Sequence, residues 1–195
     1  MTYDVVILAS DESREQVRKA IDSIVKQSVK PDDIILVSDK RELLNAVNVS
    51  TVYQSEGGIG EARRLGYNEA DAEWILFTDA DTIMPTDFVS RALAYADEEG
   101  LDAVGGKIKP VGGTPLGIVF SAVTNLADFG KGHSTLIRSD IDFSKVNGGR
   151  SEDSDIWSQA RNGSLMDFPR VETAITKNHK TLAVLIFLGI IYWIN

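Results

Sequence analysis

Two aspartates separated by one residue, Asp79 and Asp81, are the first feature of this sequence that suggests chemistry. Two carboxylates at this spacing, in a loop after a buried strand, can both turn toward one hard cation. Mg²⁺ and Mn²⁺ favour oxygen ligands and often bridge protein carboxylates to the phosphates of a substrate. Such an ion would neutralise a diphosphate leaving group. We therefore interpret the pair as a site for Mn²⁺ or Mg²⁺.

The Asp-x-Asp spacing occurs three times, and the context of each instance decides its interpretation. The other two instances are Asp140/Asp142 and Asp153/Asp155. Such a pair, taken alone, is more often a solvated turn than a metal site. Asp79 is distinguished because it directly follows the apolar run 74–78 (WILFT), which favours a buried strand.

The elements that must position this pair alternate between strands and helices over the first hundred residues. Short apolar runs rich in β-branched residues predict strands, and apolar residues at three- and four-residue steps predict helices. The predicted strands are 3–9, 34–37, 51–53, 74–78 and 102–108. The predicted helices have apolar faces over 17–25, 61–70 and 87–99, and Gly100 is placed to end the last of them.

This alternation predicts an α/β fold, with an open and mostly parallel sheet flanked by helices on both faces. Ligands of such sheets bind beyond the carboxyl ends of the strands, where Asp39 and Asp79 both fall. No stretch is long or polar enough to act as a linker, and no internal repeat is visible. We expect one domain over residues 1–180, followed by an apolar segment, 181–195.

Three stretches, in order along the chain, resemble family 2 of the glycosyltransferases, which have the GT-A fold. Residues 3–40 are similar to the family's first strand, helix and second strand, with Gln27-Ser28 and an acidic end at Asp39. Residues 61–81 resemble its Arg-Asn-x-Gly helix, the strand after it and the DxD motif. Residues 147–163 resemble its Gly-Gly turn and Glu-Asp motif. The resemblance implies that the α/β fold is of the GT-A type.

The resemblance implies a set of residues that bind the nucleotide and the metal. Asp39 and Arg63 would hold the nucleotide base, and Ala9 would line the same pocket through its backbone. Asp81 would be the direct metal ligand, with Asp79 nearer the ribose. Two departures from the family pattern leave the nucleotide open: Arg64 stands where Asn is usual, and Ser38-Asp39-Lys40 replaces Asp-Asp-Gly-Ser.

The resemblance assigns catalysis to the acids near residue 153. Asp153 would be the general base, Glu152 would help to orient the site, and His179 would lie near the metal or diphosphate. Neighbouring carboxylates should raise one or more of the local pKa values, which makes a better proton acceptor near neutrality. The structural alternative is that these acids only stabilise the start of a helix. Trp157, just after them, is expected to be a core residue.

The function implied by the resemblance is metal-dependent transfer of a sugar from a nucleotide-diphosphate-sugar to an acceptor hydroxyl, with inversion. The acceptor is a lipid, a glycan or a protein. Two alternatives stay open. A phosphatase of the haloacid dehalogenase type also uses a DxD motif at a strand end, although usually on its first strand. A non-catalytic nucleotide-sugar-binding protein would share the pocket and would not need Asp153.

Composition limits the partners of the chain. The 195 residues carry a net charge of −9, so non-specific attraction to nucleic acid is not expected. The absence of cysteine excludes disulfides and thiolate-bound zinc. The N-terminus does not have the pattern of a signal peptide, so we expect a cytoplasmic protein.

The apolar segment Leu182–Ile194 leaves two interpretations open. It is shorter than the roughly 20 residues that a spanning helix needs, yet too uniformly apolar for a surface helix. Lys177 and Lys180, just before it, are placed to meet lipid headgroups. The segment either attaches the protein to the inner face of a membrane or packs into the core or a dimer interface.

Overall fold

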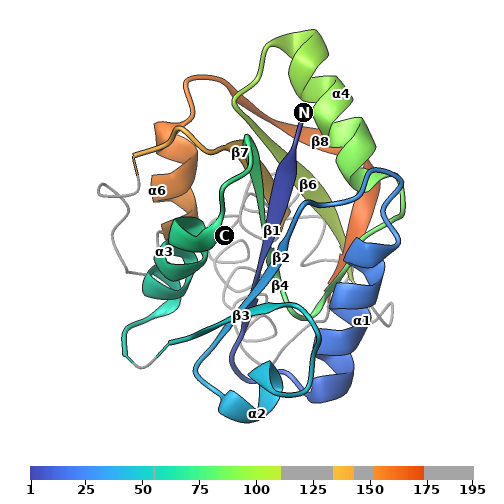
Figure 1. Cartoon of the computed structure of the whole chain (residues 1–195). Helices are drawn as coiled ribbons and strands as arrows, with labels where there is room; N and C mark the ends of the chain where they lie inside the picture. The colour runs from blue at the N-terminus through green and yellow to red at the C-terminus, as the bar shows by residue number, and fades with distance from the viewer. Residues whose placement is uncertain (55, 111–133, 143–151, 174–195) are drawn as a thin grey trace, which may run out of the picture.

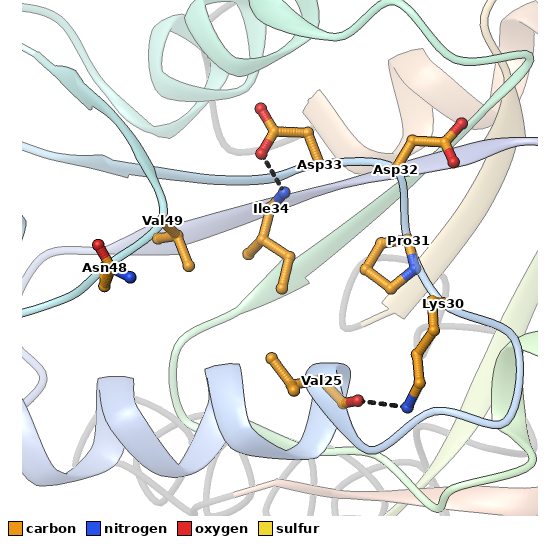
Figure 2. A pocket seen from close by; sticks show the side chains of 8 residues that line it. All are labelled: Val25, Lys30, Pro31, Asp32, Asp33, Ile34, Asn48 and Val49. Carbon is orange, nitrogen blue, oxygen red and sulfur yellow. Dashed lines mark hydrogen bonds between the residues drawn. The ribbon is translucent and has the colours of Figure 1, made fainter.

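The computed structural model describes residues 1–54, 56–110, 134–142 and 152–173 (Figure 1). Its elements, in chain order, are β1 (Tyr3–Ala9), α1 (Arg14–Val25), β2 (Ile34–Ser38), α2 (Arg41–Leu44), β3 (Ser50–Tyr53), α3 (Ile59–Glu69), β4 (Trp74–Asp79), β5 (Thr82–Ile83), α4 (Phe88–Glu99), β6 (Ala103–Pro110), β7 (Ser134–Arg138), α6 (Glu152–Gln159) and β8 (Gly163–Thr173). The predicted boundary at residue 180 and the segment Leu182–Ile194 lie outside the described residues.

The strands form one sheet of eight in the order β3-β2-β1-β4-β7-β6-β8-β5. The first four are parallel to one another, β7 is antiparallel to both of its neighbours, and β5 is antiparallel to β8. β2 pairs with one edge of β1, and β3 then pairs with the far edge of β2. β4 pairs with the opposite edge of β1. The chain therefore has a topological switch point between β1 and β4, which is where open α/β sheets bind ligands.

Helices cover both faces of this sheet, as the sequence predicts. Figure 1 shows α1 and α4 on one side and α3 and α6 on the other. Val5 and Ile7 of β1 belong to the core under α1 and α4, whereas Val6 and Leu8 belong to the core under α3 and α6. Because successive strand residues point to opposite faces, a strand covered on both faces must be apolar throughout. This explains the uninterrupted apolar runs in the sequence.

Local signals set the ends of the helices. Ser13 and Gln16 form a capping box at the start of α1: the Gln16 backbone N–H donates to Ser13 Oγ at 3.3 Å, and the Ser13 N–H donates to Gln16 Oε1 at 2.9 Å. Gly100 ends α4 in the left-handed conformation, with φ of 63°. The prediction that Gly100 terminates this helix is therefore confirmed.

Four short or irregular elements escaped prediction: α2, β5, β7 and β8. Trp157 of α6 packs in the core as expected, with 9% of its surface exposed, and its Nε1 donates to Thr135 Oγ1 at 3.3 Å. Among the helices of the described residues, none is long and apolar enough to cross a bilayer.

Candidate functional site

A pocket of about 870 Å³ opens beyond the carboxyl ends of β1, β2 and β4. Its floor contains the last residues of β1, its walls come from the loops after β2 and β3, and the start of α3 closes one side. This is the edge of the sheet at which the switch point predicts a ligand. The pocket is therefore the candidate functional site.

Four of the residues predicted from the sequence line this pocket: Ala9, Asp39, Asp79 and Asp81. Ala9 ends β1 and is buried, whereas Asp39 directly follows β2 and is exposed. Asp79 is the last residue of β4 and is half-buried, and Asp81 is 8% exposed. The structure therefore brings together residues from three separate strand ends.

Arg63, a fifth predicted residue, lies inside the protein rather than in the described wall of the pocket. Only 2% of its surface is exposed, and it heads the set of largest fully buried side chains. Its neighbour Arg64 faces outward on α3 and donates from Nε to Glu61 Oε2 at 2.8 Å. This hydrogen bond lowers the pKa of Glu61 below its usual value. Arg64 therefore forms an ion pair with an acid of its own helix.

Sequence reasoning missed several residues that line the pocket. Ser10, Asp11 and Glu12 directly follow β1, so the strand-end rule that placed Asp39 and Asp79 at this edge would also have placed them there. Asp11 forms an ion pair of 3.2 Å with Lys40, between the loops that follow β1 and β2. Gln54 follows β3, and no pattern in the sequence distinguishes it.

A glycine turn brings the start of α3 to the pocket. Gly57 has φ of 96°, which favours glycine, and a Cβ at this position would lie 2.8 Å from Cβ of Glu61. Gln54 braces the same turn, because its Nε2 donates to the carbonyl oxygen of Gly58 at 2.9 Å. The helix can therefore begin at Ile59, beside the ends of the parallel strands.

The charge of the pocket is its most informative property. Five carboxylates line it, those of Asp11, Glu12, Asp39, Asp79 and Asp81. None of its described lining residues is a lysine, an arginine or a histidine. An anionic ligand is repelled by such a surface unless a cation enters with it.

The carboxylates of Asp79 and Asp81 fit a hard divalent ion, since Mg²⁺ and Mn²⁺ prefer oxygen ligands. No group of three or more His, Cys, Asp and Glu within the described ranges is arranged to hold a metal. The described carboxylates of Asp79 and Asp81 would thus supply only part of the coordination shell. Mg²⁺ is commonly held in this way, by one or two carboxylates together with substrate phosphates and water.

The residues predicted to act in catalysis lie at the limit of what the structure describes. Glu152 and Asp153 are the first two residues of α6, so these acids do begin a helix, as the structural alternative expects. Their side chains are not among the described parts of the structure, and His179 lies outside the described residues. Their predicted roles therefore stay predictions.

Comparison with known families identifies the chain. The family model described as Glycosyl transferase family 2 matches residues 4–139, well over half of the 195 residues. The chain belongs to glycosyl transferase family 2. All of β4, β1 from its second residue onward, and every residue that lines the pocket lie inside the matched region.

Curated relatives are distant and much longer. The chain is 27% identical over 103 residues to the uncharacterized glycosyltransferase EpsJ of Bacillus subtilis (strain 168), covering 46% of this chain and 29% of EpsJ. It is 28% identical over 122 residues to the poly(ribitol-phosphate) beta-N-acetylglucosaminyltransferase TarS of Staphylococcus aureus (strain Mu50 / ATCC 700699), covering 55% of this chain and 21% of TarS. The chain thus matches less than a third of the length of either relative.

Solved structures confirm the GT-A fold. Residues 1–349 of S. aureus TarS superpose with a TM-score of 0.64 at 16% identity, covering 89% of this chain and 60% of that one. The structure of the same protein in complex with UDP-GlcNAc superposes with a TM-score of 0.62 at 17% identity, covering 93% of this chain and 61% of that one. The mannosyltransferase PcManGT from Pyrobaculum calidifontis, in complex with GDP-Man and Mn²⁺, superposes with a TM-score of 0.67 at 15% identity, covering 90% of this chain and 57% of that one.

Proposed function

We propose that this chain transfers a sugar from a nucleotide-diphosphate-sugar to an acceptor hydroxyl, in a reaction that needs Mn²⁺ or Mg²⁺ and inverts the anomeric carbon. The observation that carries the proposal is the acidic pocket at the switch point between β1 and β4. A nucleotide diphosphate is an anion, and it would enter a pocket lined by five carboxylates only together with a cation. Membership of family 2 supplies the class of reaction.

In this proposal, one group of residues binds the donor. Asp39 and the backbone of Ala9 hold the nucleotide base, while Asp79 lies nearer the ribose and Asp81 would bind the metal. Arg63, predicted for the same role as Asp39, is buried outside the pocket lining and has no direct contact with the base in this proposal. Bound there, the ion would offset the charge of the departing diphosphate. Support for the metal comes from PcManGT, a protein of the same fold that was solved with GDP-Man and Mn²⁺.

Asp153 is the proposed general base. It takes the proton of the acceptor hydroxyl, and the resulting nucleophile attacks the anomeric carbon on the side opposite the diphosphate. One such displacement inverts the configuration and needs no covalent sugar–enzyme intermediate. Glu152 helps to orient this site, and His179 lies near the metal or the diphosphate.

The donor and the acceptor can be proposed only as classes. TarS was solved with UDP-GlcNAc and PcManGT with GDP-Man, which makes UDP- and GDP-sugars the first donors to test. The acceptor is a hydroxyl of a lipid, a glycan or a protein, and a lipid would suit membrane attachment through Leu182–Ile194. Family membership favours this function over a phosphatase. The position of the Asp-x-Asp motif favours it too, because in this chain the motif follows the fourth strand, whereas such phosphatases usually carry it on their first.

A turnover assay tests the proposal. The purified chain is incubated with UDP-, GDP-, CDP- and dTDP-sugars, with Mn²⁺ or with a chelator, and release of the nucleotide diphosphate is followed. We expect release from at least one donor with Mn²⁺ and none with the chelator. Release of phosphate from simple esters, with no use of any nucleotide-sugar, would instead support the phosphatase.

The variant Asp153→Asn separates an enzyme from a binding protein. We expect it to bind the donor normally and to lose about 10²–10⁴-fold in turnover, the usual contribution of a general base. Unchanged turnover would remove Asp153 from the mechanism. A wild-type chain that binds donor with metal and yet turns over none would favour the non-catalytic alternative.

A further inference from the structure

We propose that Gln27, together with Ser23, is a positioning residue for the metal site: the end of α1 holds the backbone that follows Asp81. The inference rests on the proposed function, because it concerns the metal that the function requires. It starts from Gln27, a buried polar residue with 0% exposure, for which the binding pocket gives no role.

The segment that contains Asp81 runs between distant strands of the sheet. β4 is the fourth strand in the sheet order, whereas β5, which follows Asp81 directly, is the eighth. Of the described strands, only β8 pairs with β5, which is two residues long. Upstream of Asp81, the backbone N–H of Ala80 donates to the carbonyl oxygen of Leu8 at 2.9 Å. Downstream, the pairing of β5 with β8 ends at Ile83, so the residues after it must be held by other contacts.

Gln27 and Ser23 provide these downstream contacts. The backbone N–H of Met84 donates to Ser23 Oγ at 3.2 Å. Gln27 Nε2 donates to the carbonyl oxygen of Pro85 at 2.7 Å, and Gln27 Oε1 accepts from the N–H of Val89 at 3.1 Å. Three side-chain bonds, one from Ser23 in α1 and two from Gln27 just after it, therefore fix residues 84–89, beginning three residues after Asp81.

Gln27 also completes the start of α4. The first four N–H groups of a helix have no partner within the helix. Asp87, the N-cap residue of α4, makes no side-chain capping bond, and the N–H of Val89 donates instead to Gln27, in the segment just after α1. The side-chain amide of Gln27 thus holds the start of α4 beside the end of α1, which fixes the position of the loop that leads into α4.

A purely structural role and a positioning role predict different results. Fixed backbone on both sides of a metal ligand preserves the geometry that the ion needs, and loss of such supporting groups typically lowers metal affinity. A purely structural role would lower the melting temperature and leave the affinity of the folded protein for metal unchanged. The affinity for Mn²⁺ therefore distinguishes the two.

The test compares Gln27→Met with Ser28→Ala. Methionine is unbranched and similar in length to glutamine, and it removes the polar bonds to Pro85 and Val89. Ser28 is the matched control, because its hydroxyl bonds Ser90 Oγ at the exposed surface while its backbone bond to Thr86 is kept in the variant. Mn²⁺ binding is followed by electron paramagnetic resonance in the presence of UDP or GDP.

We expect Gln27→Met to raise the dissociation constant for Mn²⁺ by about tenfold or more, and Ser28→Ala to leave it unchanged. If Gln27→Met does not fold, Ser23→Ala serves instead. It removes the hydroxyl that accepts from the N–H of Met84 and donates to the carbonyl oxygen of Ala20. A rise of about tenfold is expected, at the smaller end of such effects. Wild-type affinity in a folded Gln27→Met or Ser23→Ala variant would overturn the inference alone. Absence of Mn²⁺ binding by the wild type with every nucleotide would overturn the proposed function as well.

Discussion

Asp79 lies directly opposite Leu8 in the parallel pairing of β4 with β1. The N–H of the next residue, Ala80, donates to the carbonyl oxygen of Leu8 at 2.9 Å. The end of β4 is thereby held beside the end of β1, and the acids after both strands face one pocket. Proximity of the two strand ends, rather than the Asp-x-Asp spacing alone, is what makes this pair a candidate metal site.

Asp81→Asn is expected to weaken Mn²⁺ binding by about tenfold or more, because a neutral amide is a much poorer ligand for a hard cation than a carboxylate. Asp140→Asn is the matched control. It changes another Asp-x-Asp pair, at a side chain that is 67% exposed and only 3.8 Å from Arg138 Nε. Calorimetric titration with Mn²⁺ in the presence of nucleotide should show a loss for Asp81→Asn only. Equal losses in both variants would mean that overall charge, and not a site, binds the ion.

Gly66→Ala tests how closely α3 must approach the sheet. A Cβ at Gly66 would lie 2.2 Å from Val6 Cγ1 and 3.2 Å from Val37 Cγ2, so α3 or the strands must shift. We expect a loss of about 1–3 kcal/mol in the free energy of unfolding from this overpacking. Nucleotide binding should weaken too, because Ile59 and Ala62 of the same helix line the pocket. Urea unfolding and a binding titration measure the two effects.

Gly100→Ala is the control for the glycine experiment. The position has φ of 63° and open space around it, so the substitution adds backbone strain without a clash. Its expected cost is about 1–2 kcal/mol, with nucleotide affinity unchanged. Normal stability and normal binding in Gly66→Ala would show that the helix does not pack as described.

Asp4→Asn tests a buried carboxylate that organises the end of the sheet opposite the pocket. Asp4 is 4% exposed and accepts hydrogen bonds from the backbone N–H groups of Asp33, Asp71 and Ala72, at 2.8–3.0 Å. An amide nitrogen in place of one oxygen would face donors that it cannot satisfy. We expect a loss of about 1–3 kcal/mol in the free energy of unfolding, measured in urea. A loss no larger than that of the exposed change Glu15→Gln would contradict this role.

Tyr67 should make stability fall at high pH. Burial raises the pKa of Tyr67, and the charges of Asp140 and Asp142 raise it further. The Tyr67 hydroxyl donates to the carbonyl oxygen of Ser139 at 2.6 Å, and the carbonyl oxygen of Ile141 lies 3.0 Å from the same hydroxyl. Because the pKa of Tyr67 is higher in the folded than in the unfolded state, its protonated hydroxyl contributes to the free energy of unfolding. This contribution is complete below the unfolded-state pKa of about 10 and is lost as pH rises through the folded-state pKa.

The measurement for Tyr67 is the free energy of unfolding against pH, for the wild type and for Tyr67→Phe. Above about pH 10 the wild type should lose stability more steeply than the variant, since only the wild type must keep this hydroxyl protonated to stay folded. Parallel curves would show that the folded and unfolded states ionise Tyr67 alike.

The part of the fold that the sequence predicted is the part covered on both faces. β1, β2 and β4 are continuous apolar runs because helices lie on either side of them. β8 was missed because it contains Gly163 and Pro169, residues that are unusual within strands, and because its pairing with β6 shifts between Gly106 and Ile108. β5 has two residues, too few to show a period.

The site was predictable where it follows strand ends and was not where it depends on tertiary contacts. Asp39 and Asp79 could be placed because parallel strands share their carboxyl edge. The burial of Arg63 could not, since an arginine in a helix is ordinarily exposed. The role of Gln27 depends on a bond to Pro85, 58 residues away, which leaves no periodic pattern.

The most direct test of the account is a calorimetric titration of the chain with UDP, GDP, CDP and dTDP, each with Mn²⁺ and with a chelator. Five carboxylates around the pocket require that the ion and the nucleotide bind together. We predict that at least one nucleotide diphosphate binds with Mn²⁺ and that its binding is lost with the chelator. Equal affinity under both conditions, or no binding with either Mn²⁺ or Mg²⁺, would contradict the account.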